Sequence, residues 1–259
     1  MTPTFDRTPP ADLGAARPDA HQAAQLVATA GITLLDADPQ FHFSSTTFDP
    51  ATERLVGALL PTDVHTSLHL PSLTLAVGNV SRSLREGPMA DHAAWLAAQL
   101  GAELVWPTWD LPTGPTLDYA GFTASDEQLA ALTRWFAASH AALDRFVPGV
   151  GDASDIRVWP HHFDIARLVT LADDAADPEA SRTVGIGMTP GDGGIAEPYL
   201  YVTPWPYPET RSTPALPAGR WNTEGWYGAV LEASDVPGQA GVDAFLRVAF
   251  DHARRSALG

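Results

Sequence analysis

Apolar residues recur at helical spacing in four stretches of the chain, which predicts four main helices. Gly31 and Gly101 follow the first two stretches and are expected to end those helices. Ser125 and Gln128 form a capping box at the start of the third. The predicted helices cover approximately Asp19–Ala30, Asp91–Leu100, Ser125–Leu143 and Val242–Ala257.

Between these helices the hydrophobic period changes to two, which is typical of half-buried β-strands. Pro- and Gly-containing turns separate the strands and leave no room for the helical crossovers of a parallel sheet, so antiparallel pairing is predicted. The sequence therefore predicts an α+β fold with antiparallel sheets. The predicted strands cover 41–48, 54–60, 64–77, 156–164, 166–171, 184–188, 199–205 and 226–233.

The order helix, strands, helix occurs twice along the chain. This order predicts an N-terminal α+β half, 19–123, and a C-terminal α+β half, 124–259, that pack as one unit. An old duplication is one hypothesis for the order, although the halves share little sequence. Residues 1–18 contain Pro, Asp and Arg without an apolar core, so we expect a flexible tail and no secretory signal.

Acidic residues dominate the charge. The 259 residues include 15 basic and 31 acidic side chains, a net charge of −16. A field of this sign repels phosphate backbones and anionic lipids, so neither a nucleic acid nor a membrane is an expected partner. No apolar run is long enough to span a bilayer. A cytoplasmic location is the simplest expectation.

The chain contains neither lysine nor cysteine; every basic residue is an arginine. Without lysine there is no Schiff base, no anchor for pyridoxal phosphate and no phosphate-loop lysine. Without cysteine there is no thiol nucleophile, iron–sulfur cluster or thiolate zinc site. A divalent metal held by His, Asp or Glu stays open as a cofactor.

The segment Trp159–Ala166 has two adjacent histidines and a carboxylate. In an extended chain His161 and Phe163 share the face of Trp159, and His162 shares the other face with Asp164. A histidine and a carboxylate two residues apart lie roughly 6.5 Å apart, which suits acid–base chemistry or a metal pair. Packing of one histidine beside Trp159, with the other solvated, is the alternative.

A glycine-rich turn follows further along the chain. Gly185 and Gly187 leave one strand face bare, where a ligand or, more simply, an aromatic ring can approach. Asp192 is expected to accept backbone N–H groups in the turn, and it is also a candidate catalytic carboxylate.

The next strand alternates polar-tipped aromatic residues with apolar ones. Tyr199, Tyr201 and Trp205 share one face, which suits a flat ligand or an interface between copies of the chain. Glu197 precedes them as a candidate acid or base. Arg220 is a candidate clamp for an anionic group, with a salt bridge in the loop as the alternative.

One strand of the N-terminal half also has an unusual polar face. His65, Ser67 and His69 alternate on it. The two histidines are expected roughly 13 Å apart, which is too far for a common metal. We interpret this face as solvated or lining a cleft.

Residues 157–206 resemble an uncharacterised bacterial protein family, a domain of unknown function. The shared motifs are Phe-Asp-[Ile/Leu]-Ala, Pro-Gly-Asp and a Tyr-x-Tyr strand that ends in Pro-x-Pro. The resemblance implies a fold unit without an assigned activity. The family has a small polar residue at the position of His162, which favours His161 as the partner of Asp164. The matching positions are Phe163, Asp164, Pro190, Gly191, Asp192 and Tyr201.

Three functions stay open on the sequence. The first is an enzyme with acid–base or metal-assisted chemistry on a small molecule, the second a protein that binds a flat ligand without catalysis, and the third a homo-oligomer that pairs through its aromatic face. The candidate catalytic residues are His161, His162, Asp164, Asp192 and Glu197. The candidate ligand-binding residues are Trp159, Tyr199, Tyr201, Trp205 and Arg220.

Overall fold

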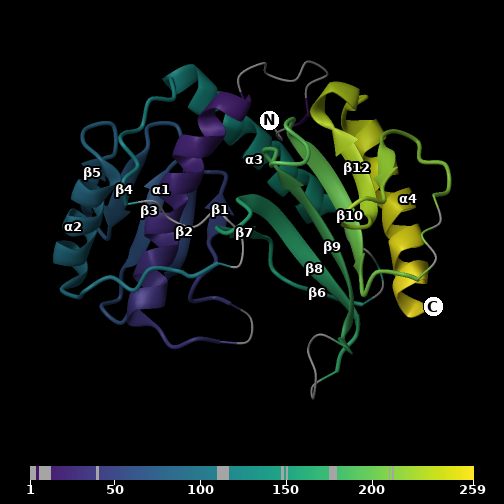
Figure 1. Ribbon diagram of the computed structural model, residues 1–259, viewed down its shortest axis with the longest axis horizontal. Helices are drawn as coiled ribbons and strands as arrows, with labels where there is room; N and C mark the ends of the chain where they lie inside the picture. Colours follow the sequence, from purple (N-terminus) through teal and green to yellow (C-terminus); the bar gives the residue numbers. More distant parts are fainter. Residues whose placement is uncertain are drawn as a thin grey trace. The chain divides into compact units, whose positions relative to one another are not determined.

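The computed structural model has the α+β fold that the sequence predicts (Figure 1). Its described part contains four α-helices and two antiparallel sheets, of five and seven strands. None of these helices is long and apolar enough to cross a membrane. The described residues are 4–5, 13–38, 41–109, 117–146, 149, 151–174, 180–209, 211 and 213–259.

The chain divides into two compact units that differ from the two predicted halves. Unit 2 comprises Ala11–Ala137 together with Arg157–Asp164. Unit 1 comprises Met1–Pro10, Ala138–Ile156 and Ile165–Gly259. The division therefore falls inside the third helix instead of at 123/124, and the histidine-containing segment belongs with the N-terminal residues.

Unit 2 contains a five-stranded antiparallel meander in the order β1-β2-β3-β4-β5. The predicted strand 64–77 is in fact a hairpin, because Leu73 has a positive φ of 48° in the turn that separates β3 from β4. The strands are β1 Thr47–Asp49, β2 Arg54–Leu59, β3 His65–His69, β4 Thr74–Val77 and β5 Val80–Ser83.

Two helices pack on one face of this sheet. Helix α1 (Leu13–Leu34) contacts β2 and β3, and α2 (Met89–Leu100) contacts β4. The strands turn fully buried leucines toward α1 and α2, and alanines at helical spacing fill the facing side of α1. The face is formed by Leu55, Leu68 and Leu75.

Helix α1 begins earlier and ends later than predicted. Pro18 lies within its first turns, and Gly31 does not end it. Gly31 instead allows α1 to approach the chain at Phe43, because a Cβ at Gly31 would lie 2.0 Å from the Phe43 carbonyl oxygen. The predicted tail is thus partly helical, and Phe5 is buried; residues 1–3 and 6–12 lie outside the described part.

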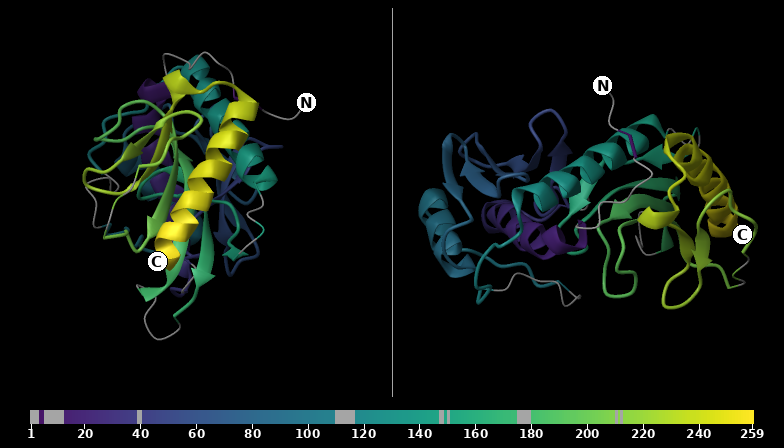
Figure 2. Two further views of the ribbon diagram at one scale, coloured as in Figure 1. Left: turned by 90° about the vertical axis from the view of Figure 1, so that its right-hand side faces the viewer. Right: turned by 90° about the horizontal axis from the view of Figure 1, so that it is seen from above.

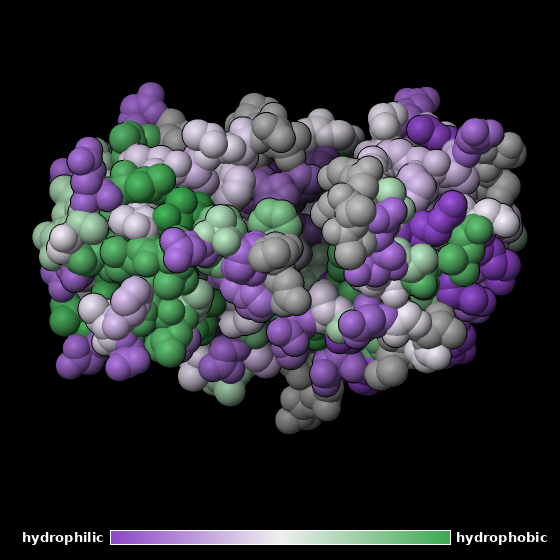
Figure 3. Space-filling view, turned by 90° about the horizontal axis from the view of Figure 1, so that it is seen from below, coloured by the Kyte–Doolittle hydropathy of each residue, from purple (hydrophilic) through white to green (hydrophobic). Residues whose placement is uncertain are grey.

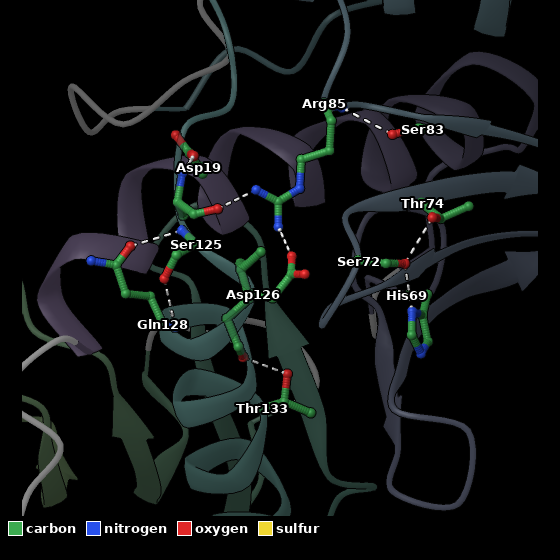
Figure 4. A network of polar contacts seen from close by, with 12 residues as sticks. Asp19, His69, Ser72, Thr74, Ser83, Arg85, Ser125, Asp126, Gln128 and Thr133 are labelled. Carbon is green, nitrogen blue, oxygen red and sulfur yellow. Dashed lines mark hydrogen bonds and ion pairs between the residues drawn. The ribbon is translucent and has the colours of Figure 1, made fainter.

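Two helix ends lie where the sequence predicts them: α2 ends at Gly101, and α3 begins at the capping box. Gly101, with φ of 64°, caps α2. Helix α3 (Asp126–Arg145) starts at the predicted box: Ser125 N–H donates to Gln128 Oε1 at 2.9 Å, and Gln128 N–H donates to Ser125 Oγ at 3.2 Å (Figure 4).

A buried carboxylate ties α1 to the segment before α3. Asp19 on α1 is 3% exposed and accepts hydrogen bonds from the Tyr119 hydroxyl and, at 2.6 Å, from the Ala124 N–H. Burial and the hydrogen bond with Asp19 raise the pKa of Tyr119. Arg85 donates to the Ala124 carbonyl and, at 2.6 Å, to Asp126 (Figure 4).

Replacement of Asp19 by Ala is expected to lower the free energy of unfolding by about 2 kcal/mol, because the buried Ala124 N–H and the partly buried Tyr119 hydroxyl lose a charged acceptor. Chemical denaturation measures the change. Asp126→Ala is the matched control: its side chain is 91% exposed, so the loss should stay below about 1 kcal/mol. Equal losses in the two variants would contradict this account of the network.

Unit 1 contains antiparallel strands in the order β11-β12-β10-β9-β8-β6. Helix α4 (Gln239–Leu258) lies along β9, β10 and β12 (Figure 2). It buries Phe245, Leu246 and Phe250. The strands of the seven-stranded sheet are β6 Asp152–Ala153, β7 Arg157–Trp159 (of unit 2), β8 Asp164–Ala172, β9 Arg182–Thr189, β10 Tyr199–Trp205, β11 Arg220–Asn222 and β12 Gly228–Glu232.

Apolar side chains also reach the surface of unit 2. Leu59, Val80 and Val105 are 53%, 46% and 54% exposed. Figure 3 shows apolar surface gathered at the left, the side on which Figure 1 places β4, β5 and α2. Single exposed apolar residues are ordinary, so these three carry no functional inference by themselves.

Candidate functional site

Residues 160–163 form a turn between β7 and β8, where the sequence predicts one continuous extended strand. Phe163 N–H donates to the Trp159 carbonyl at 2.7 Å, and Phe163 has a positive φ of 58°. The turn breaks the alternation of faces on which the prediction rested. Trp159, His161 and Phe163 therefore do not form one strand face.

The turn instead separates the predicted site residues by depth. Phe163 is fully buried, Asp164 is 6% exposed, His161 is half-buried and His162 is exposed. The prediction that His162 and Asp164 share a face is therefore wrong. The two imidazole rings, predicted on opposite faces, lie together with centroids 4.4 Å apart.

Helix α1 holds this turn through a backbone carbonyl. His21 Nε2 lies 2.5 Å from the Pro160 oxygen, and Gln25 Nε2 donates to the same oxygen. The His21 ring also stacks on Phe163, with centroids 5.1 Å apart and planes 10° apart. Because a carbonyl can only accept, His21 carries its proton on Nε2.

A tryptophan from a third segment completes the arrangement around His161. Trp109 Nε1–H donates to Gln25 Oε1 at 2.9 Å. Its ring lies 5.4 Å from the His161 ring, and the Trp159 ring lies 6.1 Å from it on an edge-to-face approach. We call His21, His161, His162, Trp109 and Trp159 the histidine cluster.

Burial keeps two of these imidazoles neutral. It lowers the pKa of His161 to about 4, and the neighbouring His162 and His21 lower it further. The pKa of His21 is also lowered to about 4, chiefly by burial and also by Arg17 and His162, although the hydrogen bond to the Pro160 carbonyl opposes the shift. Near pH 7 His161 is therefore a neutral imidazole, which can both donate and accept a hydrogen bond.

The described residues offer no obvious metal centre. No group of three or more His, Asp or Glu side chains among them could hold a metal ion. The neutral imidazole and the indole rings of the histidine cluster support proton exchange and stacking on aromatic rings.

The candidate carboxylate Asp192 lies in unit 1, where it organises a turn. Its Oδ1 accepts the N–H groups of Gly194 and Ile195 at 2.7 and 2.8 Å, as the turn prediction requires. Its Oδ2 accepts the Tyr199 hydroxyl at 2.5 Å. Gly191, with φ of 101°, is needed in this turn because a Cβ there would lie 2.5 Å from the Ala196 oxygen.

Two other unit 1 candidates also have structural partners. Glu197 Oε2 accepts the N–H of Ser234, within the short 3₁₀ helix Ala233–Asp235, at 3.0 Å. Arg220 donates to Glu232 Oε1 from Nε at 3.1 Å and from Nη2 at 2.8 Å. The salt bridge expected as the alternative for Arg220 is thus confirmed.

The aromatic face of β10 packs largely on itself. Tyr199 is only 5% exposed, and Tyr201 lies over Gly187, where a Cβ would approach its hydroxyl oxygen to 2.6 Å. The expected approach of an aromatic ring to this glycine is confirmed. Trp205, 39% exposed, is the one predicted ligand-binding residue of β10 that presents a large surface, and it meets the equally accessible Tyr207 edge to face at 5.4 Å.

Sequence reasoning missed three members of the site region: His21, Gln25 and Trp109. A signal existed for two of them. His21 and Gln25 are four residues apart, so they lie on one side of the alanine-rich α1, where a fully buried Gln25 needs polar partners. No pattern in the sequence points to Trp109, because only the fold brings its loop to Gln25.

Comparisons with protein-family models, with curated proteins and with solved structures found no match to this chain.

Proposed function

We propose that unit 2 binds a small molecule beside His161, and that the neutral imidazole of His161 exchanges a proton or shares a hydrogen bond with it. The molecule would have a flat or apolar face to lie against indole and a polar hydrogen to meet the imidazole. We propose this acid–base role for His161 and assign His162 to the exposed rim.

The observation that carries the proposal is the enclosure of a half-buried, neutral imidazole by two indole rings. Strongly shifted pKa values cluster at functional sites. The rings of the histidine cluster come from three segments: α1, the segment at Trp109, and Trp159 with the turn that follows it. The Gln25 side chain of α1 bonds to the other two segments, at Trp109 and at Pro160.

His161→Gln tests the proposal in a binding screen. A library of small cyclic and aromatic compounds is tested by ligand-observed NMR against the unchanged protein, His161→Gln and Trp109→Leu. We expect compounds that bind the unchanged protein, and a loss of affinity of about tenfold or more in each variant, because one hydrogen bond and one stacked ring are removed.

His42→Gln is the matched control, because His42 is an exposed histidine of unit 2 that contacts Asp38 at 2.9 Å outside the cluster. Its binding profile should equal that of the unchanged protein. The proposal is wrong if no compound binds, or if every bound compound keeps its affinity in both His161→Gln and Trp109→Leu.

A second candidate function is non-catalytic binding at the exposed end of β10. Trp205 and Tyr207 are 39% and 37% exposed, and the Arg211 guanidinium lies 5.9 Å from the Tyr207 ring centroid. Exposed aromatic rings of this kind suit a flat ligand or a second copy of the chain. Light scattering across a dilution series separates these outcomes, since only pairing of copies changes the mass.

Three further statements remain proposals: membership of the bacterial family of unknown function, a cytoplasmic location, and the lack of nucleic-acid partners. The family motifs fall on residues with structural roles, such as the buried Phe163 and the turn residues Gly191 and Asp192. These structural roles support a resemblance between the fold of this part of the chain and that of the family. Cell fractionation and nucleic-acid gel shifts test the other two.

A further inference from the structure

The second face of the five-stranded sheet in unit 2 is polar. Helices α1 and α2 pack on the leucine face, as shown by Gly57, whose Cβ would lie 3.0 Å from Val27 of α1, and by Arg82, which bonds to His92 of α2. The opposite face has a row of cross-strand partners, one from each strand. The row runs Asp49, Arg54, His69, Thr74, Ser83.

The hydroxyl groups of Ser72 and Thr74 form a chain of hydrogen bonds with the imidazole of His69. His69 Nδ1 lies 2.7 Å from Ser72 Oγ, which lies 2.7 Å from Thr74 Oγ1 (Figure 4). These contacts allow either direction of donation; when Thr74 donates to Ser72 and Ser72 donates to Nδ1, the neutral His69 carries its proton on Nε2. This Nε2–H then has no acceptor among the described residues and is available to a ligand.

The neighbouring guanidinium is also available. Arg54 is the cross-strand partner of His69, and its one side-chain hydrogen bond to another described residue goes from Nη1 to Ser67 Oγ at 3.3 Å. It makes no salt bridge with another described residue. The nearest acidic partner in the row, Asp49, accepts the N–H of Ala51 at 2.9 Å and the hydroxyl of Thr52 at 2.5 Å.

We propose that Arg54, His69 and Ser67 form a binding site for a phosphate group on this sheet face. A partly buried guanidinium that pairs with no carboxylate of the described residues, beside an imidazole N–H and a serine hydroxyl, offers the charge and the donors that a phosphate requires. The site differs from the histidine cluster in every residue and does not depend on the proposed function.

Binding of a phosphate changes the titration of His69. In the free protein, burial, followed by the charge of Arg54, lowers the pKa of His69, while Glu53 opposes the shift. A bound dianion stabilises the imidazolium and offsets Arg54, so the pKa of His69 rises when phosphate binds. A purely structural His69 would not respond.

The experiment follows the ring signals of His69 by NMR as a function of pH, with and without inorganic phosphate. At about 10 mM, phosphate fills most of a site with a dissociation constant of about 1 mM. Sodium chloride matches the ionic strength, because screening alone alters the influence of Arg54. We expect phosphate to raise the titration midpoint of His69 and chloride to leave it unchanged.

Arg54→Gln should abolish the phosphate response, and Arg54→Lys should retain a weaker one, because it keeps the charge and loses the guanidinium fork. Arg220→Gln is the matched control, since Arg220 already pairs with Glu232, and it should respond like the unchanged protein. If Arg54→Gln does not fold, Ser67→Ala replaces it, with an expected loss of affinity of severalfold.

Methyl phosphate in place of inorganic phosphate distinguishes the sources of the group: a stronger response to the ester assigns the site to a phosphorylated ligand, and an equal or weaker one to free phosphate. The proposal is overturned if the His69 midpoint does not move with either compound, or if it moves equally in Arg54→Gln.

Discussion

Acidification from pH 7 to pH 5 is expected to destabilise the protein through His21 and His161. Each has a pKa lowered from 6.5 to about 4 in the folded chain. Between these values the unfolded chain binds protons that the folded chain refuses, so the free energy of unfolding falls as the pH falls. By pH 5 the loss is at most about 2 kcal/mol for each histidine, and it is complete just below pH 4.

Chemical denaturation at a series of pH values measures this loss. His21→Gln and His161→Gln should each flatten the curve between pH 6.5 and pH 4, because the titrating group is removed. His69 and His92, whose pKa values are also lowered, contribute a background slope that both variants keep. Exposed His42→Gln serves as the control outside the cluster. An unchanged slope in both cluster variants would contradict the burial of these imidazoles.

Gly31→Ala is expected to destabilise the protein by about 3 kcal/mol, although alanine favours helices more than glycine does. The new Cβ would lie 2.0 Å from the Phe43 carbonyl oxygen, so α1 or the segment at Phe43 must move. Thermal and chemical denaturation measure the change.

Gly14→Ala provides the matched control on the same helix. No atom lies within 4 Å of the position of its Cβ, so the substitution should be neutral or should stabilise by up to about 1 kcal/mol. A loss of stability in Gly31→Ala without a loss in Gly14→Ala follows only if α1 approaches Phe43 closely at Gly31. A neutral Gly31→Ala would show that α1 does not approach Phe43.

Local signals in the sequence were sufficient for the helices and for antiparallel pairing. The capping box at Ser125 and the glycine at 101 act through neighbouring residues alone, so a sequence pattern predicts them. Gly31 was misread as a helix end because its reason, the approach of Phe43, comes from another segment. The hairpin within 64–77 was missed because Leu73 is an unusual residue for a positive φ.

In the candidate site, too, local features were predictable from the sequence and contacts between distant segments were not. The adjacent histidines and the buried Asp164 were visible in the sequence, but their faces were predicted from an extended chain that the turn at Phe163 replaces. The partners that give His161 its environment, His21 and Trp109, come from distant segments. The role of Asp192 as a turn residue was foreseen, because its partners Gly194 and Ile195 follow it closely in the chain. A salt bridge of Arg220 was foreseen as an alternative, but its partner Glu232, on the neighbouring strand β12, was not.

Burial beside the rings of Trp109 and Trp159 keeps His161 a neutral imidazole. The most direct test is the titration midpoint of the His161 ring in the unchanged protein, measured by NMR. Enclosure predicts a midpoint of about 4. A midpoint near 6.5, the value of a solvated histidine, would contradict it.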